Sequence, residues 1–405
     1  MGVPPSDALT DRTVLVGVTG GIAAYKTVEF VRGLAKDGLQ PRVVMTAAAQ
    51  RFVTSLTFAA ISQATVLDDD SAWQAGGGWF EHIEAARAAQ VMVVAPATAN
   101  TVAKLATGMA DNLLCAIALA FRGPLVVAPA MNWAMYEHPA TVENLRVLRE
   151  RGAEVVPAET GELACGEAGA GRMAEPAVLR LAVRRAMAST VAGPLAGKRV
   201  VITSGGTREA VDEVRFVGNR SSGKMGRALA VEAYLRGADV VLVTTQPQAG
   251  EPYTVVEVES ADEMAAAVRE HCAAAHVLVM AGAVADFKPR EAAAGKIERA
   301  GRETLTLDMV RTVDILRETV DTGLFRVAFA AEAGPHLQRA RDKRIAKDVD
   351  LLVFNDALAD GVGIGADDNE VTIIGPSREV QVPRASKAVC ASGIVDEIEA
   401  GLEGR

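Results

Sequence analysis

The chain has 405 residues, of which 50% are hydrophobic, and a formal net charge of −9, so it can bury the cores of two or three domains. The acidic balance and the lack of a basic block argue against nucleic acid or an acidic membrane surface as a partner. No apolar run reaches the length of a membrane span, no secretory leader precedes the first predicted strand, and the cysteines lack the spacing of a disulfide framework or a zinc site. We therefore expect a cytoplasmic protein.

The chain begins with a predicted βαβ unit, in which strands at residues 13–18 and 41–45 flank a helix at residues 22–36. The turn after the first strand contains Gly20 and Gly21, but it lacks the GxGxxG spacing of dinucleotide-binding folds, and no carboxylate follows the second strand. This pattern disfavours a nicotinamide cofactor and favours a mononucleotide phosphate at the start of the helix.

The rest of the first half continues the alternation of strands and helices. Strands are predicted at residues 91–95, 125–128 and 154–156, and helices from residue 102 and at residues 111–121, 141–151 and 176–189. Thr98 and Asn132 follow two of these strands, at the edge of an open α/β sheet where ligands bind. We expect a mobile flap in the glycine-rich residues 161–172 and a joint between domains at residues 190–197.

The second half starts again from a buried strand, predicted at residues 200–202, which runs through a glycine turn towards a helix at residues 225–235. Further strands are predicted at residues 239–243, 254–258, 277–280, 325–330, 351–354 and 370–374, with helices at residues 261–274 and from residue 385 and a basic helix before residue 351. The alternation predicts an α/β fold of two doubly wound (Rossmann-like) domains, at residues 1–190 and 191–405.

Residues 218–224 match the P-loop spacing, but the context of that motif is absent. Met225 stands where a Ser or Thr should hold magnesium, and no clear strand leads directly into the loop. Asn219 and the two serines after it precede a helix, whose first N–H groups attract anions. We therefore interpret residues 218–224 as a phosphate-facing loop that is not a P-loop.

Three polar residues of the first half are candidates for chemistry, each with a plainer alternative. His82 is flanked by apolar residues, and such a histidine is more often structural than catalytic. Cys165 alone would be a small buried residue, but a glycine-rich flap would expose it to a ligand. Asn132 follows a strand and can simply cap a turn.

In the second half, four lysines can meet a triphosphate or merely carry solvated surface charge; they are Lys288, Lys296, Lys343 and Lys347. Lys343 and Lys347 lie one helical turn apart, which suits two contacts with one polyanion. Asp286, at the end of a strand, can bind a ribose, a base or a metal, or cap a turn.

Taken together, these motifs resemble the bifunctional phosphopantothenoylcysteine decarboxylase/phosphopantothenate–cysteine ligases of bacterial coenzyme A synthesis. The first half is similar through GGIAAYK (20–26), His82-Ile83, APATANT (95–101), PAMNWAM (129–135) and ACGEAGAGRM (164–173). The second half is similar through TSGGTRE, GNRSSGKMG, AVADFKP, KIE (296–298), FAAE and the helix with Lys343 and Lys347. The resemblance implies a flavodoxin-like FMN domain with the decarboxylase at residues 1–190 and a nucleotide-binding ligase domain at residues 191–405.

For the decarboxylase, the resemblance implies an FMN site at Gly20, Gly21, Ile22, Thr46, Thr98, Ala99, Asn100 and Thr101. His82 would be the base that helps FMN oxidise the cysteinyl part of the substrate, after which carbon dioxide leaves from the thioaldehyde. Asn132 and Met135 would hold the substrate, Asn132 by its carboxylate. Cys165 would donate a proton as the reduced flavin returns its electrons, which suits a thiol with an ordinary pKa of about 8.5.

For the ligase, the resemblance implies CTP as co-substrate with Mg²⁺ or Mn²⁺, and an acyl-CMP intermediate that the amine of cysteine attacks. The positions that match the family's CTP site are Met280, Ala281, Gly282, Asp286, Lys296, Val313, Asp314, Ile315, Leu316, Phe329, Lys343 and Lys347. Asn219 and Lys296 match residues that handle the acyl-nucleotide intermediate. The spacing by itself does not distinguish CTP from ATP, and it assigns no metal ligands.

The resemblance further implies a homo-oligomer, a dodecamer built from decarboxylase trimers and ligase dimers, with small-molecule substrates and neither nucleic acid nor membrane as partner. An alternative is a flavin-binding regulatory or scaffold protein of the same fold without turnover. The presence of both His82 and Cys165 favours catalysis over this alternative.

Overall fold

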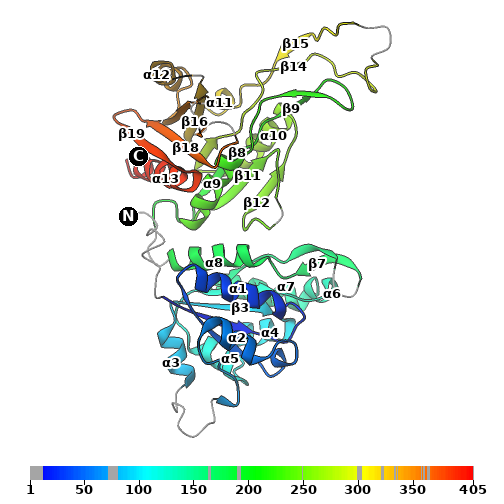
Figure 1. The fold of residues 1–405 in the computed structure, drawn as a ribbon, viewed down its shortest axis with the longest axis vertical. Coiled ribbons are helices and arrows are strands. Elements are labelled where there is room, and N and C mark those ends of the chain that lie inside the picture. Colours follow the sequence, from blue (N-terminus) through cyan, green and yellow to red (C-terminus); the bar gives the residue numbers. More distant parts are fainter. Residues whose placement is uncertain are drawn as a thin grey trace. The chain divides into compact units, whose positions relative to one another are not determined.

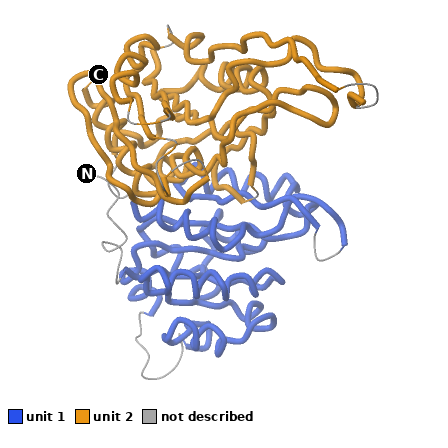
Figure 2. Tube along the Cα trace, turned by 45° about the horizontal axis from the view of Figure 1, so that its top comes forward, with its two compact units in different colours: residues 1, 3–191 blue, residues 2, 192–405 orange. Residues whose placement is uncertain are grey.

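The computed structural model describes residues 12–71, 81–162, 166–188, 193–248, 250–298, 303–320, 323–332, 334, 336–356, 358, 361–362 and 365–404. These residues form two compact units, one within residues 3–191 and one within residues 192–405 (Figure 2). Each unit has a central sheet that is mainly parallel, with helices packed against it (Figure 1). The predicted doubly wound α/β class is confirmed.

The sheet of the first unit has five parallel strands in the order β2-β1-β3-β4-β5. They are β1 (Thr13–Val18), β2 (Gln40–Met45), β3 (Val91–Ala97), β4 (Leu125–Pro129) and β5 (Glu154–Val155). The helices are α1 (Ala24–Lys36), α2 (Ser55–Ser62), α3 (Glu81–Ala88), α4 (Ala99–Thr107), α5 (Leu113–Ala120), α6 (Trp133–Tyr136), α7 (Pro139–Glu150) and α8 (Pro176–Ala188), with a short 3-10 turn at Ala49–Arg51.

Alternation along β1 explains why this unit has two cores. Val14 and Val16 pack in one core with Phe30 of α1, whereas Leu15 packs in the other with Val102 of α4. Because side chains of a strand point alternately to the two faces, a strand covered on both sides must be apolar, as residues 14–18 of β1 are.

The sheet of the second unit has eight strands in the order β12-β11-β8-β13-β16-β17-β18-β19, of which the last two run antiparallel. They are β8 (Arg199–Ser204), β11 (Asp239–Thr244), β12 (Thr254–Glu257), β13 (Val277–Met280), β16 (Phe325–Glu332), β17 (Leu351–Asp356), β18 (Asp368–Ile374) and β19 (Glu379–Ser386). The helices are α9 (Lys224–Leu235), α10 (Ala261–Cys272), α11 (Ile315–Glu318), α12 (Leu337–Ala346) and α13 (Lys387–Glu403).

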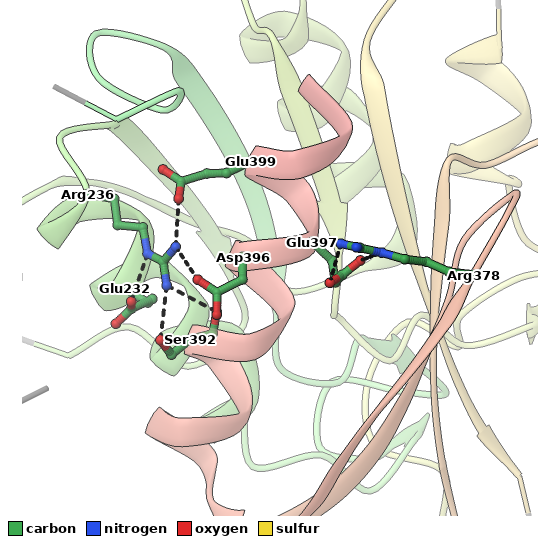
Figure 3. A network of polar contacts seen from close by, with 7 residues as sticks. All are labelled: Glu232, Arg236, Arg378, Ser392, Asp396, Glu397 and Glu399. Atoms are coloured by element: carbon green, nitrogen blue, oxygen red, sulfur yellow. Dashed lines mark hydrogen bonds and ion pairs between the residues drawn. The ribbon is translucent and has the colours of Figure 1, made fainter. Parts of the chain in front are cut away.

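Helices α9 and α13 of this unit pack side by side and are joined by Arg236 (Figure 3). The Arg236 side chain is only 3% exposed, and its Nη1 donates to Asp396 Oδ1 at 2.6 Å and to Glu399 Oε2 at 2.7 Å. Its Nε donates to Glu232 Oε1 at 2.9 Å. Burial opposes the charge, but the three carboxylates outweigh it and raise the pKa of Arg236.

Among the described residues, three two-stranded ribbons lie outside the main sheets. They are β6 (Glu159–Glu162) with β7 (Ala168–Arg172), β9 (Arg208–Ala210) with β10 (Phe216–Gly218), and β14 (Phe287–Pro289) with β15 (Met309–Arg311). The segments that include β14 and β15 extend away from the sheet of the second unit as an arm (Figure 1).

The structure corrects several predicted elements. The expected flap contains an element that was not predicted, the antiparallel ribbon of β6 and β7, in which each strand satisfies the backbone of the other. The mobility of the flap stays a prediction. The last helix begins at Lys387 and not at residue 385, since β19 extends to Ser386 and Ser386 caps the helix. His82 lies on a helix, α3, that the sequence interpretation missed. In the part of the chain that the structure describes, no helix has the length and apolarity needed to span a bilayer.

Candidate functional site

In the first unit, the sheet order reverses between β1 and β3, whose outgoing loops separate to opposite sides of the sheet. Such a switch point is where open α/β sheets bind ligands. Thr19 Oγ1, after β1, donates to Pro96 O at 2.6 Å and accepts from Thr98 N at 3.1 Å. The hydroxyl therefore holds the two loops together and brings Gly20 and Gly21 close to the start of α4.

The loop after β2 completes this group of predicted flavin residues. Thr46 Oγ1 donates to Val18 O at 3.4 Å and accepts from Ala49 N at 3.3 Å, so it lies beside the end of β1. A Cβ on Gly20 would stand 2.4 Å from Ala48 Cβ, and only glycine fits this contact. A Cβ on Gly21 would find Thr98 Cγ2 at 3.6 Å as its nearest neighbour.

The donors at this switch point fit a phosphorylated flavin. Thr98 caps α4 and accepts from Thr101 N at 3.4 Å, while the first-turn residues Ala99 and Asn100 follow it. Within the described residues, the N–H groups of Gly20 and Ile22 make no hydrogen bond. Free N–H groups at helix starts suit a phosphate, and the exposed Ile22 side chain suits contact with an aromatic ring system.

His82 is half-buried on α3 and makes no hydrogen bond with the described residues. Its helix packs with α5 in the second core of this unit, through Ala85 and Ala86. Among the described residues, no hydrogen bond or ion pair joins His82 to the loop residues above. Cys165 lies outside the described residues.

The predicted substrate residues lie after β4 and against the β6–β7 ribbon: Asn132 caps α6 and Met135 lies within it. Asn132 Oδ1 accepts from Ala134 N at 2.9 Å, while its Nδ2 donates to Glu167 Oε2 at 3.2 Å. Trp133 Nε1 donates to the same Glu167 oxygen at 2.8 Å. Sequence reasoning missed Glu167, although it stands inside the glycine-rich motif.

Glycines allow this close approach of the ribbon. A Cβ on Gly171, whose φ is +145°, would stand 2.2 Å from Met131 O, and one on Gly169 would stand 2.6 Å from Trp133 Cβ. Met131 N donates to Gly171 O at 3.0 Å. The ribbon therefore lies directly on the loop that carries Asn132.

In the second unit, a cavity of about 910 Å³ collects nearly all of the predicted ligase residues. It is lined by Asn219, Met280, Ala281, Gly282, Asp286, Val313, Asp314, Ile315, Leu316, Phe329, Lys343 and Lys347, among others. Lys296 is described but does not line this cavity, and Lys288 forms an ion pair with Asp262 outside it. The volume is in the range of small-molecule sites.

The floor of the cavity is the switch point between β8 and β13. Gly282 N donates to Thr203 Oγ1 at 3.0 Å, and Ala283 N donates to Gly205 O at 2.7 Å. Asn219 Nδ2 donates to Val284 O at 3.0 Å, which ties the loop before α9 to the loop after β13. Two loops about sixty residues apart therefore form one surface.

The loop with P-loop spacing forms one wall of the cavity, and its structure differs from that of a P-loop. It leaves the antiparallel β10 and not a central strand, and it starts α9 at Gly223, whose φ is +68°. Lys224 Nζ donates to Asp367 Oδ1 at 2.6 Å. The lysine is therefore held by an aspartate from a distant segment.

Cationic side chains surround the cavity, and sequence reasoning found only some of them. Lys347 Nζ pairs with Asp314 Oδ2 at 2.5 Å, and Lys343 lines the same wall. Lys387, at the start of α13, was missed because only the antiparallel strands β18 and β19 bring it there. Burial and then the charge of Lys224 lower the pKa of Lys387.

No group of three or more His, Cys, Asp or Glu side chains that could hold a metal occurs among the described residues. Asp286 and Asp314 nevertheless line the cavity.

Comparison with known proteins decides the family. Residues 3–187 match the family model described as Flavoprotein, and residues 195–402 match the DNA/pantothenate metabolism flavoprotein C-terminal domain. The chain is 42% identical over 400 residues to the coenzyme A biosynthesis bifunctional protein CoaBC of Bacillus subtilis (strain 168), with 97% of this chain and 98% of the relative covered. The chain belongs to the family of bifunctional coenzyme A biosynthesis proteins. The predictions of this family and of a bifunctional decarboxylase and ligase are confirmed.

One further relative and two solved structures are also similar to this chain. The protein of the same name from Vibrio cholerae is 40% identical over 396 residues, covering 96% of this chain and 98% of the relative. The crystal structure of the C-terminal domain of a CoaBC protein is 34% identical, with a TM-score of 0.44, and covers 53% of this chain and 100% of that one. A PPC decarboxylase mutant complexed with pantothenoylaminoethenethiol is 36% identical, with a TM-score of 0.40, and covers 43% and 97%.

Proposed function

We propose that the chain catalyses two consecutive steps: CTP-dependent ligation of cysteine to 4′-phosphopantothenate, then FMN-dependent decarboxylation of the product to 4′-phosphopantetheine. The ligase step is assigned to residues 191–405 and the decarboxylase to residues 1–190. The observation that carries the proposal is the convergence of twelve predicted ligase residues, scattered between Asn219 and Lys347, on one cavity.

In the decarboxylase, the loops at Gly20–Ile22, Thr46 and Thr98–Thr101 would hold FMN, which would accept two electrons from the cysteinyl group and return them after decarboxylation. Free N–H groups at Gly20 and Ile22 would bind the phosphate. Asn132, fixed by its cap to α6, presents Nδ2 to the substrate carboxylate. His82 removes a proton from the cysteinyl group and Cys165 returns one to the product.

In the ligase, the carboxylate of 4′-phosphopantothenate attacks the α-phosphorus of CTP and releases pyrophosphate. The amine of cysteine then attacks the acyl-CMP carbonyl, and CMP leaves as the amide forms. Lys343 and Lys347 line the cavity and supply positive charge for the triphosphate. Asn219 and Lys296 handle the acyl-nucleotide.

In this proposal, magnesium arrives with the nucleotide. Mg²⁺ commonly binds through substrate phosphates, water and one or two carboxylates. Asp286 and Asp314 are the carboxylates of the cavity that could complete its coordination. Manganese would occupy the same oxygen ligands.

A homo-oligomer, with decarboxylase trimers and ligase dimers grouped into a dodecamer, completes the proposal. Ile22 and Tyr25, near the start of α1, are each 60% exposed and offer apolar surface for contact with another copy. Sedimentation equilibrium of the full chain should give about twelve copies; a monomer at working concentration would contradict this part.

The test is an absorbance spectrum of the purified chain, followed by addition of 4′-phosphopantothenate, cysteine, CTP and magnesium. A flavin spectrum with release of pyrophosphate and carbon dioxide is expected. His82→Asn should stop carbon dioxide release in a folded, flavin-loaded protein, and Lys296→Gln should stop pyrophosphate-coupled ligation while the decarboxylase continues. A colourless chain that stays inert after FMN is added would overturn the proposal in favour of a binding protein.

A further inference from the structure

The segment that carries Lys296 lies across the turn between β9 and β10. Ala293 N donates to Val211 O at 3.0 Å, and Ile297 N donates to Asp212 Oδ2 at 3.0 Å. These two bonds bracket Lys296 on both sides along the chain. The Lys296 side chain itself is exposed.

Asp212 is the centre of this contact. Its side chain has no exposed surface, yet it is a carboxylate, and a buried carboxylate requires compensating hydrogen bonds. Oδ1 accepts from Val214 N at 2.8 Å and from Arg215 N at 2.7 Å. Oδ2 accepts from Ile297 N and from Arg215 Nη1, the latter at 3.0 Å.

Arg215 closes the contact from the other side. Its Nη1 also donates to Ile297 O at 3.1 Å, so both backbone polar groups of Ile297 are held by one turn. Burial opposes ionisation of Asp212, but the N–H groups of Ile297, Val214 and Arg215 and the Arg215 charge outweigh it and lower its pKa. The carboxylate is therefore charged at neutral pH, which strengthens each bond.

We propose that Asp212 is a positioning residue for the ligase, because it fixes the backbone beside Lys296 and leaves only the lysine side chain free to reach the acyl-nucleotide. This inference rests on the proposed role of Lys296. Lys296 does not line the cavity, so its side chain must approach the substrate from the arm. A fixed backbone restricts the conformations from which it can do so, and a misplaced catalytic group loses rate more than binding.

The first measurement is amide hydrogen exchange of the full chain, read in the peptide that covers residues 293–298. Asp212→Asn keeps the size and one acceptor oxygen but presents an amide NH₂ towards Ile297 N, so exchange of this peptide should rise about tenfold. Glu213→Gln is the matched control, since Glu213 is exposed and adjacent, and makes no hydrogen bond or ion pair within the described residues. It should leave the exchange unchanged.

The second measurement is steady-state ligase kinetics on the same preparations, with the decarboxylase as an internal check of folding. Asp212→Asn should lower kcat about tenfold and change the KM for CTP by no more than about twofold. If exchange of this peptide in Asp212→Asn equals that of the unsubstituted chain, Asp212 does not fix the backbone beside Lys296. If exchange rises but kcat is unchanged, Asp212 is not a positioning residue for the ligase.

Two further variants separate the possible failures. If Lys296→Gln retains ligase turnover, the proposed function of Lys296 is wrong, whereas the exchange result for Asp212 stands by itself. If Asp212→Asn does not fold, Arg215→Gln serves the exchange measurement, because it removes the bond to Ile297 O and leaves the N–H groups on Asp212 in place. A smaller rise in the same peptide is expected, and no rise would contradict the proposal.

Discussion

Glu167 Oε2 accepts a hydrogen bond from Asn132 Nδ2 at 3.2 Å, and so joins the β6–β7 ribbon to the loop after β4. Asn132 cannot turn away easily, because its Oδ1 caps α6 through Ala134 N. The N–H group that we assign to the substrate carboxylate therefore already faces a carboxylate of the chain. Trp133 Nε1 binds the same oxygen and strengthens the contact.

Glu167→Ala should lower kcat/KM of the decarboxylase on the order of tenfold or more, since it removes two hydrogen bonds of about 1 kcal/mol each that hold the ribbon. Glu167→Gln retains an acceptor oxygen and should stay within about threefold of the unsubstituted enzyme. Both variants should keep full ligase turnover. Unchanged decarboxylation by Glu167→Ala, or equal loss of both activities, would contradict this role.

Gly171→Ala should abolish decarboxylase activity and leave the ligase intact. The new Cβ would stand 2.2 Å from Met131 O, at a residue whose φ is +145°, so the ribbon must move off the Asn132 loop. Gly152→Ala is the control: its φ is +88°, but nothing lies within 4 Å of the added Cβ. That variant should cost only about 1 kcal/mol of backbone strain and remain active, and a fully active Gly171→Ala would show that the ribbon does not dock as described.

Arg236→Met should destabilise the second unit strongly. Glu232 and Glu399 would remain largely buried without a counter-charge, which typically costs about 3–5 kcal/mol. Arg378→Met is the matched control (Figure 3), because Arg378 pairs with Glu397 of α13 but is 59% exposed, and exposed ion pairs contribute about 0–1 kcal/mol. Urea unfolding of the ligase unit measures the loss of stability in both variants. Similar unfolding midpoints for the two variants would contradict the prediction.

Among the cysteines of the chain, only Cys165 should react quickly with a disulfide reagent at pH 8. Burial raises the pKa of Cys272 to about 12, and burial also raises the pKa values of Cys115 and Cys390. A higher pKa means less thiolate at a given pH, so at pH 8 only about one Cys272 in ten thousand is ionised. Titration with a disulfide reagent at pH 8 should find at most one fast thiol per chain, absent in Cys165→Ala, and two or more fast thiols would contradict it.

Local sequence patterns were sufficient for the α/β class and for most strands. Val14 to Val18 and Val91 to Ala95 are apolar throughout because helices cover both faces of a parallel sheet, and that requirement is visible in a short window. The glycines and threonines at the strand ends predicted the ligand-binding edge of the sheet. A turn at a strand end must satisfy its own backbone, and ligands of open α/β sheets bind beyond the carboxyl ends of the strands.

The tertiary structure alone decided which distant residues meet. Asp212 and Ile297 are 85 residues apart, and no local pattern records that the carboxylate of one will accept the N–H of the other. The ribbons β6–β7, β9–β10 and β14–β15 escaped prediction because each strand is short and is stabilised by its partner more than by its own residues. Lys387 reaches the cavity of the second unit through strand order, which depends on how the whole sheet assembles. The sequence by itself therefore determined which functional side chains the chain contains. Tertiary packing between segments far apart in the sequence determined which of these side chains lie close enough to act together.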